Sequence, residues 1–179
     1  NGDHAFISGH GGFFVVRLDD LPDGLIETVA QVPVNLNSDE EFDDVQGIAV
    51  DETGTFIFIA TDSSRAVASY SFNPDSGAVE GPLDILFDGL PLFENLPGAT
   101  SRGRYHAETE RFYISGRRGT IVTVDVSDPE DLKLISVWKN STYEGEVQDV
   151  RVVDFGSGPR VLMVTDGEGF SILDPDDGM

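Results

Sequence analysis

Hydrophobic and polar residues alternate over short stretches of this chain, and no stretch carries the longer period of an extended helix. Residues 120–126 show the period-2 pattern of a half-buried strand. The runs 56–60 and 161–164 are continuously apolar, which is typical of strands covered on both faces. Clusters of Gly, Pro, Asp and Asn separate the runs and predict turns. The pattern predicts an all-β chain, with at most one helical turn at 128–132.

This strand pattern recurs four times. The units begin at Ile7, Ala60, Ile114 and Val164, which places them 53, 54 and 50 residues apart. A second marker keeps the same spacing: VQGIAV at 45–50 is echoed by VQDVRV at 147–152, whereas residues 101–106 of the third unit have diverged. About four short strands in about 50 residues is typical of one blade of a β-propeller. A β-sandwich is the alternative, but it requires no repeat.

We expect one domain over 1–179, with blades at approximately 1–36, 37–92, 93–140 and 141–179. The second blade is expected to have strands near 45–51, 55–61, 66–72 and 79–87, and the third near 100–106, 111–115, 119–126 and 132–138. The first blade lacks its innermost strand and the fourth its outermost strand. Because a propeller protects its edges by closing its ring, we interpret the chain as a section of a larger propeller. A four-bladed ring with imperfect ends is the alternative.

Two segments resemble known propellers. The sequence VTVDVSDPEDL at 122–132 resembles the LVIVD repeat of bacterial and archaeal surface propellers. The stretch from VQGIAVD at 45–51 to YSFNPDSG at 70–77 is similar to a blade of the YncE-like and lactonase-like seven-bladed propellers. The resemblance implies the fold and carries over no catalytic residue of a lactonase, phytase or sugar dehydrogenase, because the matched features are strands and turns.

Charge narrows the possible partners. The chain has 33 Asp and Glu against 11 Lys and Arg, which gives a net charge of −22. This charge repels nucleic acids and anionic membrane surfaces. An acidic chain with only two lysines suits a halophilic, marine or calcium-rich extracellular setting. The absence of cysteine excludes disulfides, thiolate metal sites and a cysteine nucleophile, and no apolar run has the length of a membrane span.

One face of the predicted propeller is the candidate ligand face. Two kinds of connection are expected on that face. The first links the outer strand of one blade to the inner strand of the next, and the second links the second and third strands within each blade. The charged side chains expected there are His10, Asp43, Asp44, Asp62, Arg117, Arg118, Glu146, Asp166 and Glu168. The alternative is a solvated charged rim.

Calcium is the metal that best fits these carboxylates, because it takes six to eight oxygen ligands. The candidate ligands are Asp44, Asp62, Glu146 and Asp166. The acidic cluster at 39–44 lacks EF-hand spacing, and in the alternative interpretation such Asp and Asn residues form turns through hydrogen bonds to the backbone. The three histidines share no zinc-ligand spacing.

Motifs for covalent catalysis are missing. The sequence has no G-x-S-x-G and no complete phosphate-binding loop, and GHGG at 9–12 is interpreted as a turn between strands. Asn140 begins an N-glycosylation sequon, which favours a secreted protein.

These observations favour a non-enzymatic extracellular or cell-surface propeller that serves as a binding or assembly module. Its expected partners are another protein, the remaining blades of a ring or further copies in a homo-oligomer or surface assembly, and not a nucleic acid. The alternative function is a calcium-assisted hydrolase of the lactonase or phosphoesterase kind.

Overall fold

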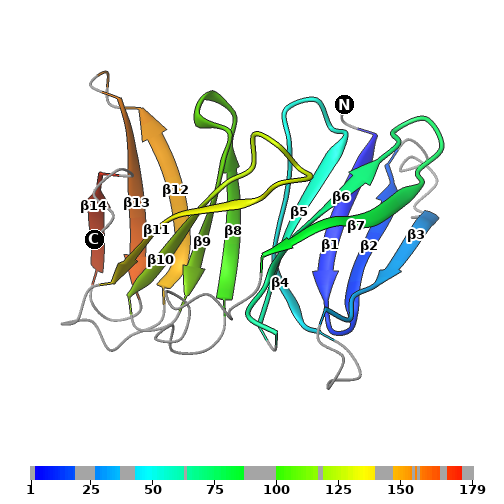
Figure 1. Cartoon of the computed structure of the whole chain (residues 1–179), viewed down its shortest axis with the longest axis horizontal. Coiled ribbons are helices and arrows are strands. Elements are labelled where there is room, and N and C mark those ends of the chain that lie inside the picture. Colours follow the sequence, from blue (N-terminus) through cyan, green and yellow to red (C-terminus); the bar gives the residue numbers. More distant parts are fainter. Residues whose placement is uncertain are drawn as a thin grey trace.

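The structure is a computed structural model that describes residues 3–18, 27–36, 43–62, 64–86, 100–116, 119–139, 147–154, 156, 158–165 and 169–174. These residues form fourteen strands and one short 3₁₀ turn, η2 (Ala107–Thr109). The strands belong to four separate antiparallel sheets of three, four, four and three strands (Figure 1). The predicted all-β fold, with incomplete first and last blades, is confirmed. No described helix is long and apolar enough to cross a membrane.

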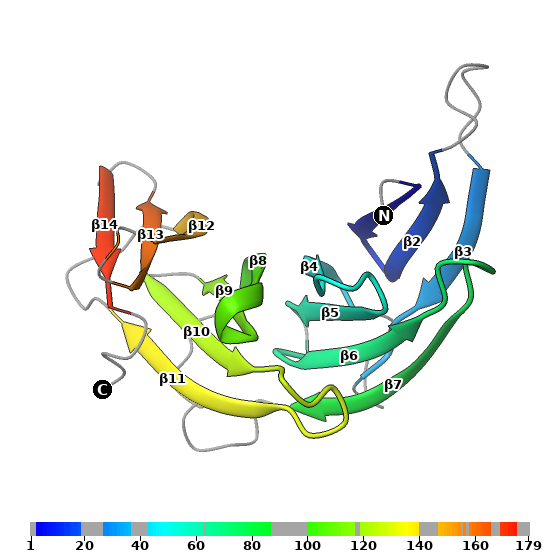
Figure 2. The ribbon, with the colours of Figure 1, turned by 90° about the horizontal axis from the view of Figure 1, so that it is seen from above.

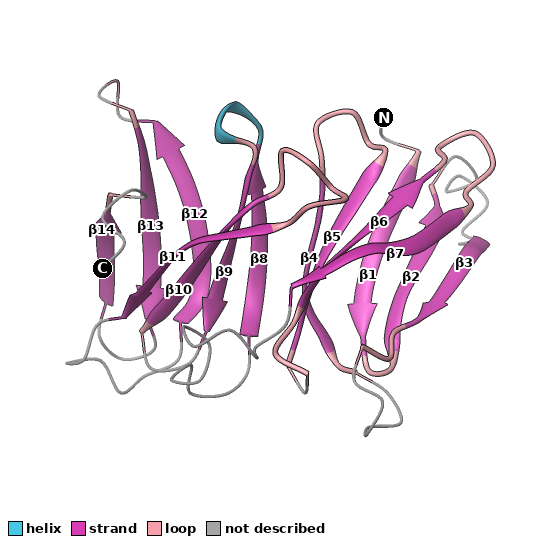
Figure 3. Ribbon diagram, viewed as in Figure 1, coloured by secondary structure: helices cyan, strands magenta, loops and turns pink. Residues whose placement is uncertain are grey.

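Each sheet is a meander, because strands that follow one another in the chain lie side by side in the sheet (Figure 3). The first sheet contains β1 (His4–Gly9), β2 (Gly12–Arg17) and β3 (Glu27–Pro33). The second contains β4 (Val45–Val50), β5 (Phe56–Thr61), β6 (Val67–Phe72) and β7 (Val79–Leu86). The third contains β8 (Thr100–His106), β9 (Arg111–Gly116), β10 (Thr120–Asp125) and β11 (Lys133–Lys139). The fourth contains β12 (Val147–Asp154), β13 (Pro159–Thr165) and β14 (Gly169–Leu173).

The four sheets are arranged along an arc, as the view from above shows (Figure 2). Strands β4, β8 and β12 lie on the inner side of the arc, and β3, β7 and β11 lie on its outer side. Along the inner side β4 packs beside both β1 and β8, and β8 packs beside β12. Sheets set radially, with their first strands innermost, are the blades of a propeller. Each four-stranded blade matches its predicted strand positions within two residues at each end.

The strand register corrects the sequence alignment of the third unit. In each of the last three blades, the last residue of the second strand pairs with the first residue of the inner strand. A β-bulge in the inner strand follows directly after this pair. That last residue is Thr61 in the second blade, Gly116 in the third and Thr165 in the fourth. Sequence similarity had aligned Ser115 with Thr61. The one-residue difference matters because it exchanges the two faces of a strand.

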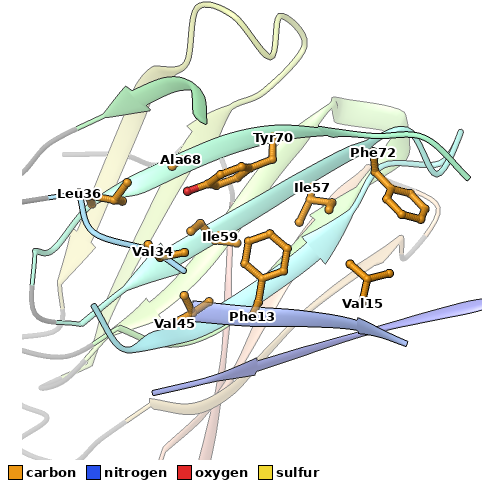
Figure 4. Packing of buried hydrophobic residues seen from close by; sticks show 11 residues of the cluster. Phe13, Val15, Val34, Leu36, Val45, Ile57, Ile59, Ala68, Tyr70 and Phe72 are labelled. Atoms are coloured by element: carbon orange, nitrogen blue, oxygen red, sulfur yellow. The ribbon is translucent and has the colours of Figure 1, made fainter. Parts of the chain in front are cut away.

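Apolar cores fill the spaces between neighbouring blades. In the first core Phe13 and Val15 of β2 meet Ile57, Ile59 and Tyr70 of the second blade (Figure 4). All five side chains are at most 2% exposed. Successive residues of β5 point into opposite cores, which explains why the sequence 56–60 is apolar without alternation.

The second and third cores repeat this arrangement. Phe58 and Ala60 of β5 join Phe112 and Ile114 of β9. On the other face of the third blade, the remaining core is formed by Tyr113 and Ile121 with Val150, Val161 and Met163 of the fourth blade. Each junction therefore joins one face of a blade to the opposite face of the next.

Two glycines allow the inner strands β4 and β8 to approach closely. A Cβ atom on Gly47 would lie 2.9 Å from the backbone nitrogen of Gly103. A Cβ atom on Gly103 would overlap the ring of Phe112, which is fully buried. Real Cβ atoms do not tolerate such contacts with packed atoms, so a side chain at Gly47 is excluded by the neighbouring blade and one at Gly103 by the Phe112 ring of its own blade.

We expect Gly103→Ala to lower the free energy of unfolding by about 1–3 kcal/mol, the usual cost of overpacking a core. Gly9→Ala is the matched control, because no atom lies within 4 Å of the Cβ position there. Urea unfolding followed by tryptophan fluorescence measures both variants. Equal stability of the two variants would contradict the tight packing of Gly103 against the Phe112 ring.

Candidate ligand face

The face predicted to bind ligands is built at the junction of the first two blades. The connection that enters β4 lies against the β1–β2 turn and the β5–β6 connection. The amide of Gly11 donates a hydrogen bond to the carbonyl of Asp43 at 3.1 Å, and the amide of Asp62 donates to the carbonyl of Asp44 at 3.0 Å. The β1–β2 turn lies at the lower edge of the molecule in Figure 1. The two kinds of connection that the sequence analysis assigned to one face are thus in contact here.

The junction brings together three of the predicted ligand-face residues. The ring Nδ1 of His10 is hydrogen-bonded to the carboxylate Oδ1 of Asp44, and the backbones of these two residues form an isolated β-bridge. The His10 side chain is 84% exposed and that of Asp44 is 35% exposed. Asp62 follows β5 and is joined to Asp44 through the backbone. The His10–Asp44 pair presents an imidazole and a carboxylate at a partly exposed junction, where the carboxylate can accept hydrogen bonds from a partner or pair with its positive charge.

Asp43 has a different role from the one predicted. Asp43 is only 1% exposed, so its carboxylate is buried within the junction and does not reach the ligand face. One oxygen, Oδ2, accepts the amide hydrogen of Leu36 at 2.8 Å. The other, Oδ1, accepts the amide of Ser64 at 3.0 Å and the Ser64 hydroxyl at 2.5 Å. A buried carboxylate needs such donors, and here they come from the connections before β4 and β6.

Tyr70 lies in the first core beside this carboxylate. Tyr70 is 2% exposed, and its ring packs edge-to-face on the ring of Phe13. Burial raises the pKa of the Tyr70 phenol to about 12, with a smaller contribution from the negative charge of Asp43. The phenol therefore stays neutral well above the pH at which an exposed tyrosine ionises.

The other predicted site residues lie outside the described residues: Arg117, Arg118, Asn140, Glu146, Asp166 and Glu168. Of the four proposed calcium ligands, the structure thus describes Asp44 and Asp62. Within the described part of the chain, no three histidine, aspartate or glutamate side chains are grouped so that they can hold a metal ion.

Several carboxylates outside the predicted acidic cluster act in turns. Asp51 Oδ1 accepts the amides of Thr55 at 2.8 Å and Phe56 at 2.7 Å. Asp125 accepts the hydroxyl of Ser127 at 2.7 Å and its amide at 3.0 Å. These two bonds, the hydroxyl bond foremost, lower the pKa of Asp125. Part of the acidic composition therefore serves the turns between strands.

Known structures support the fold. The chain resembles a 6-phosphogluconolactonase-like protein from Bacteroides fragilis, with 10% identity, a TM-score of 0.67, and coverage of 96% of this chain and 50% of the other. It also resembles the Cps50 (Swd1) β-propeller domain of Myceliophteria thermophila, with 12% identity, a TM-score of 0.68, and coverage of 100% and 55%. A chain of the mitotic checkpoint complex matches with 13% identity, a TM-score of 0.61, and coverage of 97% and 46%.

The chain thus spans about half the length of the solved propellers that it resembles. At these identities the similarity shows the fold alone. No protein-family model matches the sequence, and no curated protein matches it significantly.

We expect Asp43→Asn to lower the free energy of unfolding by about 2–3 kcal/mol, because an amide has one acceptor oxygen and its NH₂ group would face a backbone donor. Asp44→Asn is the matched control: it changes the neighbouring carboxylate, which is partly exposed, and is expected to cost less than about 1 kcal/mol. Urea unfolding of both variants measures the difference. A cost for Asp44→Asn as large as that for Asp43→Asn would contradict the structural role of Asp43.

The raised pKa of Tyr70 predicts a loss of stability in alkali. Below pH 10 the phenol is neutral in both the folded and the unfolded chain, so it contributes no pH dependence. Between pH 10 and about 12 only the unfolded chain releases the proton, so stability falls by up to about 1.4 kcal/mol per pH unit. Tyr70→Phe is expected to remove this part of the slope, which chemical unfolding at several alkaline pH values measures. An unchanged slope in the variant would contradict the assignment.

Proposed function

We propose that the protein is a non-enzymatic binding module whose ligand face includes His10, Asp44 and Asp62, and that its partner is a protein surface rich in arginine or lysine. The observation that carries the proposal is the exposed His10–Asp44 pair, held beside Asp62 at a junction fixed by backbone hydrogen bonds. The net charge of −22 supports a positively charged partner, because the summed field attracts cations over distances of about a Debye length.

A location outside the cell or at its surface belongs to the same proposal. It is supported by the acidic, lysine-poor composition, which suits a salty medium, and by the resemblance of 122–132 to a repeat of surface propellers. A role in assembly is supported by the similar fold of a chain from the mitotic checkpoint complex. Propellers serve many functions, so this support is an analogy of fold.

A calcium-assisted hydrolase is the competing candidate. It is supported by the similar fold of the 6-phosphogluconolactonase-like protein and by the closeness of Asp44 to Asp62, two of its four proposed ligands. The two functions differ in what they require. The hydrolase needs a bound divalent ion and turns over a small ester or lactone, whereas the binding module needs neither.

The proposed function predicts that a synthetic arginine-rich peptide binds at this face. We expect the double substitution Asp44→Asn with Asp62→Asn to weaken binding about 5- to 10-fold, as the loss of charges around an interface does at low salt. The control is Glu52→Gln with Asp75→Asn, which makes the same change of charge in turns at the opposite edge of the second blade. Fluorescence anisotropy at two salt concentrations measures the affinities.

Equal weakening by both pairs would mean that the peptide senses only net charge, and would contradict a ligand face at this junction. The competing function is tested in the same preparation with 6-phosphogluconolactone as substrate, with calcium and with a chelator. Turnover that the chelator abolishes and calcium restores would favour the hydrolase.

A further inference from the structure

The arginines of the inner strands gather at the third junction, which lies between the third and fourth blades. Strand β8 carries Arg102 and Arg104, and β12 carries Arg151, whereas β4 of the second blade carries no charged residue. Both β8 and β12 lie on the inner side of the arc (Figure 2). The whole chain has 33 acidic residues against 11 lysines and arginines, so this local excess of positive charge runs against its composition.

Arg102 and Arg104 lie on the face of the third blade that is turned toward the fourth. Across β8 and β9, Arg104 pairs with Tyr113 and Arg102 pairs with Ser115. Tyr113 belongs to the third core, between these two blades. Because directly paired residues share one face of an antiparallel sheet, both arginines lie on the same side as Tyr113.

Small residues occupy the equivalent positions of the second blade. Gly47 and Ala49 follow the bulge of β4 as Arg102 and Arg104 follow the bulge of β8. At Gly47 the backbone of the next inner strand lies too close for a side chain. The third blade therefore places two long cationic side chains where the second blade places almost no side chain at all.

One carboxylate is shared by two of these arginines. Oδ1 of Asp149 accepts a hydrogen bond from Nη2 of Arg104 at 3.3 Å, and Oδ2 accepts one from Nε of Arg151 at 3.1 Å. Arg102 is exposed and forms no ion pair with a described residue. The side chains of Arg104 and Arg151 are 36% and 57% exposed. Three positive charges against one negative charge leave a surplus of two at a place that solvent reaches.

Two hydrogen-bond donors on this face are buried and have no acceptor among the described residues. They are Nε of Arg104 and the hydroxyl of Tyr113, a residue that is 0% exposed. Asp149 satisfies Nη2 of Arg104 and leaves its Nε without a partner. A buried donor without an acceptor destabilises a fold, so the junction favours a ligand that supplies acceptor oxygens.

We propose that the third junction binds a phosphate group, either of inorganic phosphate or of a small phosphorylated molecule, through Arg102, Arg104 and Arg151. A phosphate dianion matches the surplus of two positive charges. Its oxygens accept hydrogen bonds in several directions, as guanidinium groups from two blades require. Residues two apart in a strand are separated by about 7 Å, so both arginines of β8 can reach one phosphate with their long side chains.

The proposed site is separate from the ligand face at the junction of the first two blades. The inner strands of a propeller surround its central channel. A small ligand can therefore reach β8 and β12 whether or not further blades extend the arc.

Isothermal titration calorimetry with inorganic phosphate tests the proposal, at about pH 8, where phosphate is mainly a dianion. We expect saturable one-to-one binding. Arg102→Gln is expected to raise the dissociation constant about 10-fold, because it removes a charged donor to the phosphate. Arg17→Gln is the matched control: it makes the same change of charge on β2, where Arg17 pairs with Glu27. Absence of binding to the unaltered protein, or equal weakening by both substitutions, would overturn the proposal.

Asp149→Asn gives a prediction of the opposite sign. The amide keeps the shape of the side chain and removes the charge that competes with phosphate for Arg104 and Arg151, so the dissociation constant is expected to fall about 5-fold. Asp131→Asn is the matched control, because Asp131 also pairs with a cation, Lys133, at 2.8 Å, outside the junction. Equal gains in both variants would reveal an effect of net charge alone and would overturn the site. Circular dichroism checks that every variant is folded.

Titration with glucose 6-phosphate and with glucose distinguishes the two sources of the phosphate group. Tighter binding of glucose 6-phosphate than of inorganic phosphate would identify a phosphorylated small molecule as the ligand, and equal binding would identify the phosphate group alone. Glucose is expected not to bind. Binding of glucose 6-phosphate that Arg102→Gln leaves unchanged would overturn the role of the arginines.

Discussion

The second and third sheets carry apolar side chains on both faces, so each needs a neighbour on each side. In β5 the alternation that places Ile57 and Ile59 in the first core places Phe58 and Ala60 in the second. One sheet cannot bury both sets by folding on itself, because its strands lie in a single layer. Radial stacking meets this requirement, since every space between blades is filled from two sides. The dependence of each blade on the next follows from this constraint.

Hydrogen bonds cross each of the three junctions beside the apolar cores. At the first junction, the Asp43 carboxylate accepts hydrogen bonds from the amides of Leu36 and Ser64 and so links the connections before β4 and β6. At the second, Asp84 of β7 accepts the amide of Leu132 at 2.7 Å, and the Ser69 hydroxyl donates to the carbonyl of Pro129 at 2.5 Å. At the third, Arg104 of β8 donates to Asp149 of β12 at 3.3 Å. The segment 122–132, identified in the sequence by its resemblance to a repeat, thus ends in a turn that is bonded to the preceding blade.

Sequence periodicity predicted the strands because a strand buried on one or both faces leaves a local pattern. It also predicted that the β1–β2 turn and the entry to β4 share a face, which brought His10, Asp44 and Asp62 together. It did not predict that Asp43 is buried whereas Asp44 is partly exposed. The sequence pattern of two adjacent carboxylates is the same in both cases, and the difference depends on the amide donors of Leu36 and Ser64. The misalignment at Ser115 arises because the repeat marker has diverged in 101–106, where Gly103 leaves room for the Phe112 ring of the neighbouring strand.

The charge of the chain and its apolar junctions act on different surfaces, and salt separates their effects. Carboxylates such as Asp51 and Asp125 lie in turns, whereas the three cores contain mainly uncharged side chains. Added salt weakens the attraction of an acidic surface for a basic partner. The same salt weakens the repulsion between two acidic chains and strengthens the burial of apolar surface when it is a kosmotropic salt. A contact made by exposed carboxylates and the apolar packing of one blade on the next must therefore respond to such a salt in opposite directions, because screening weakens the first and the salt strengthens the second.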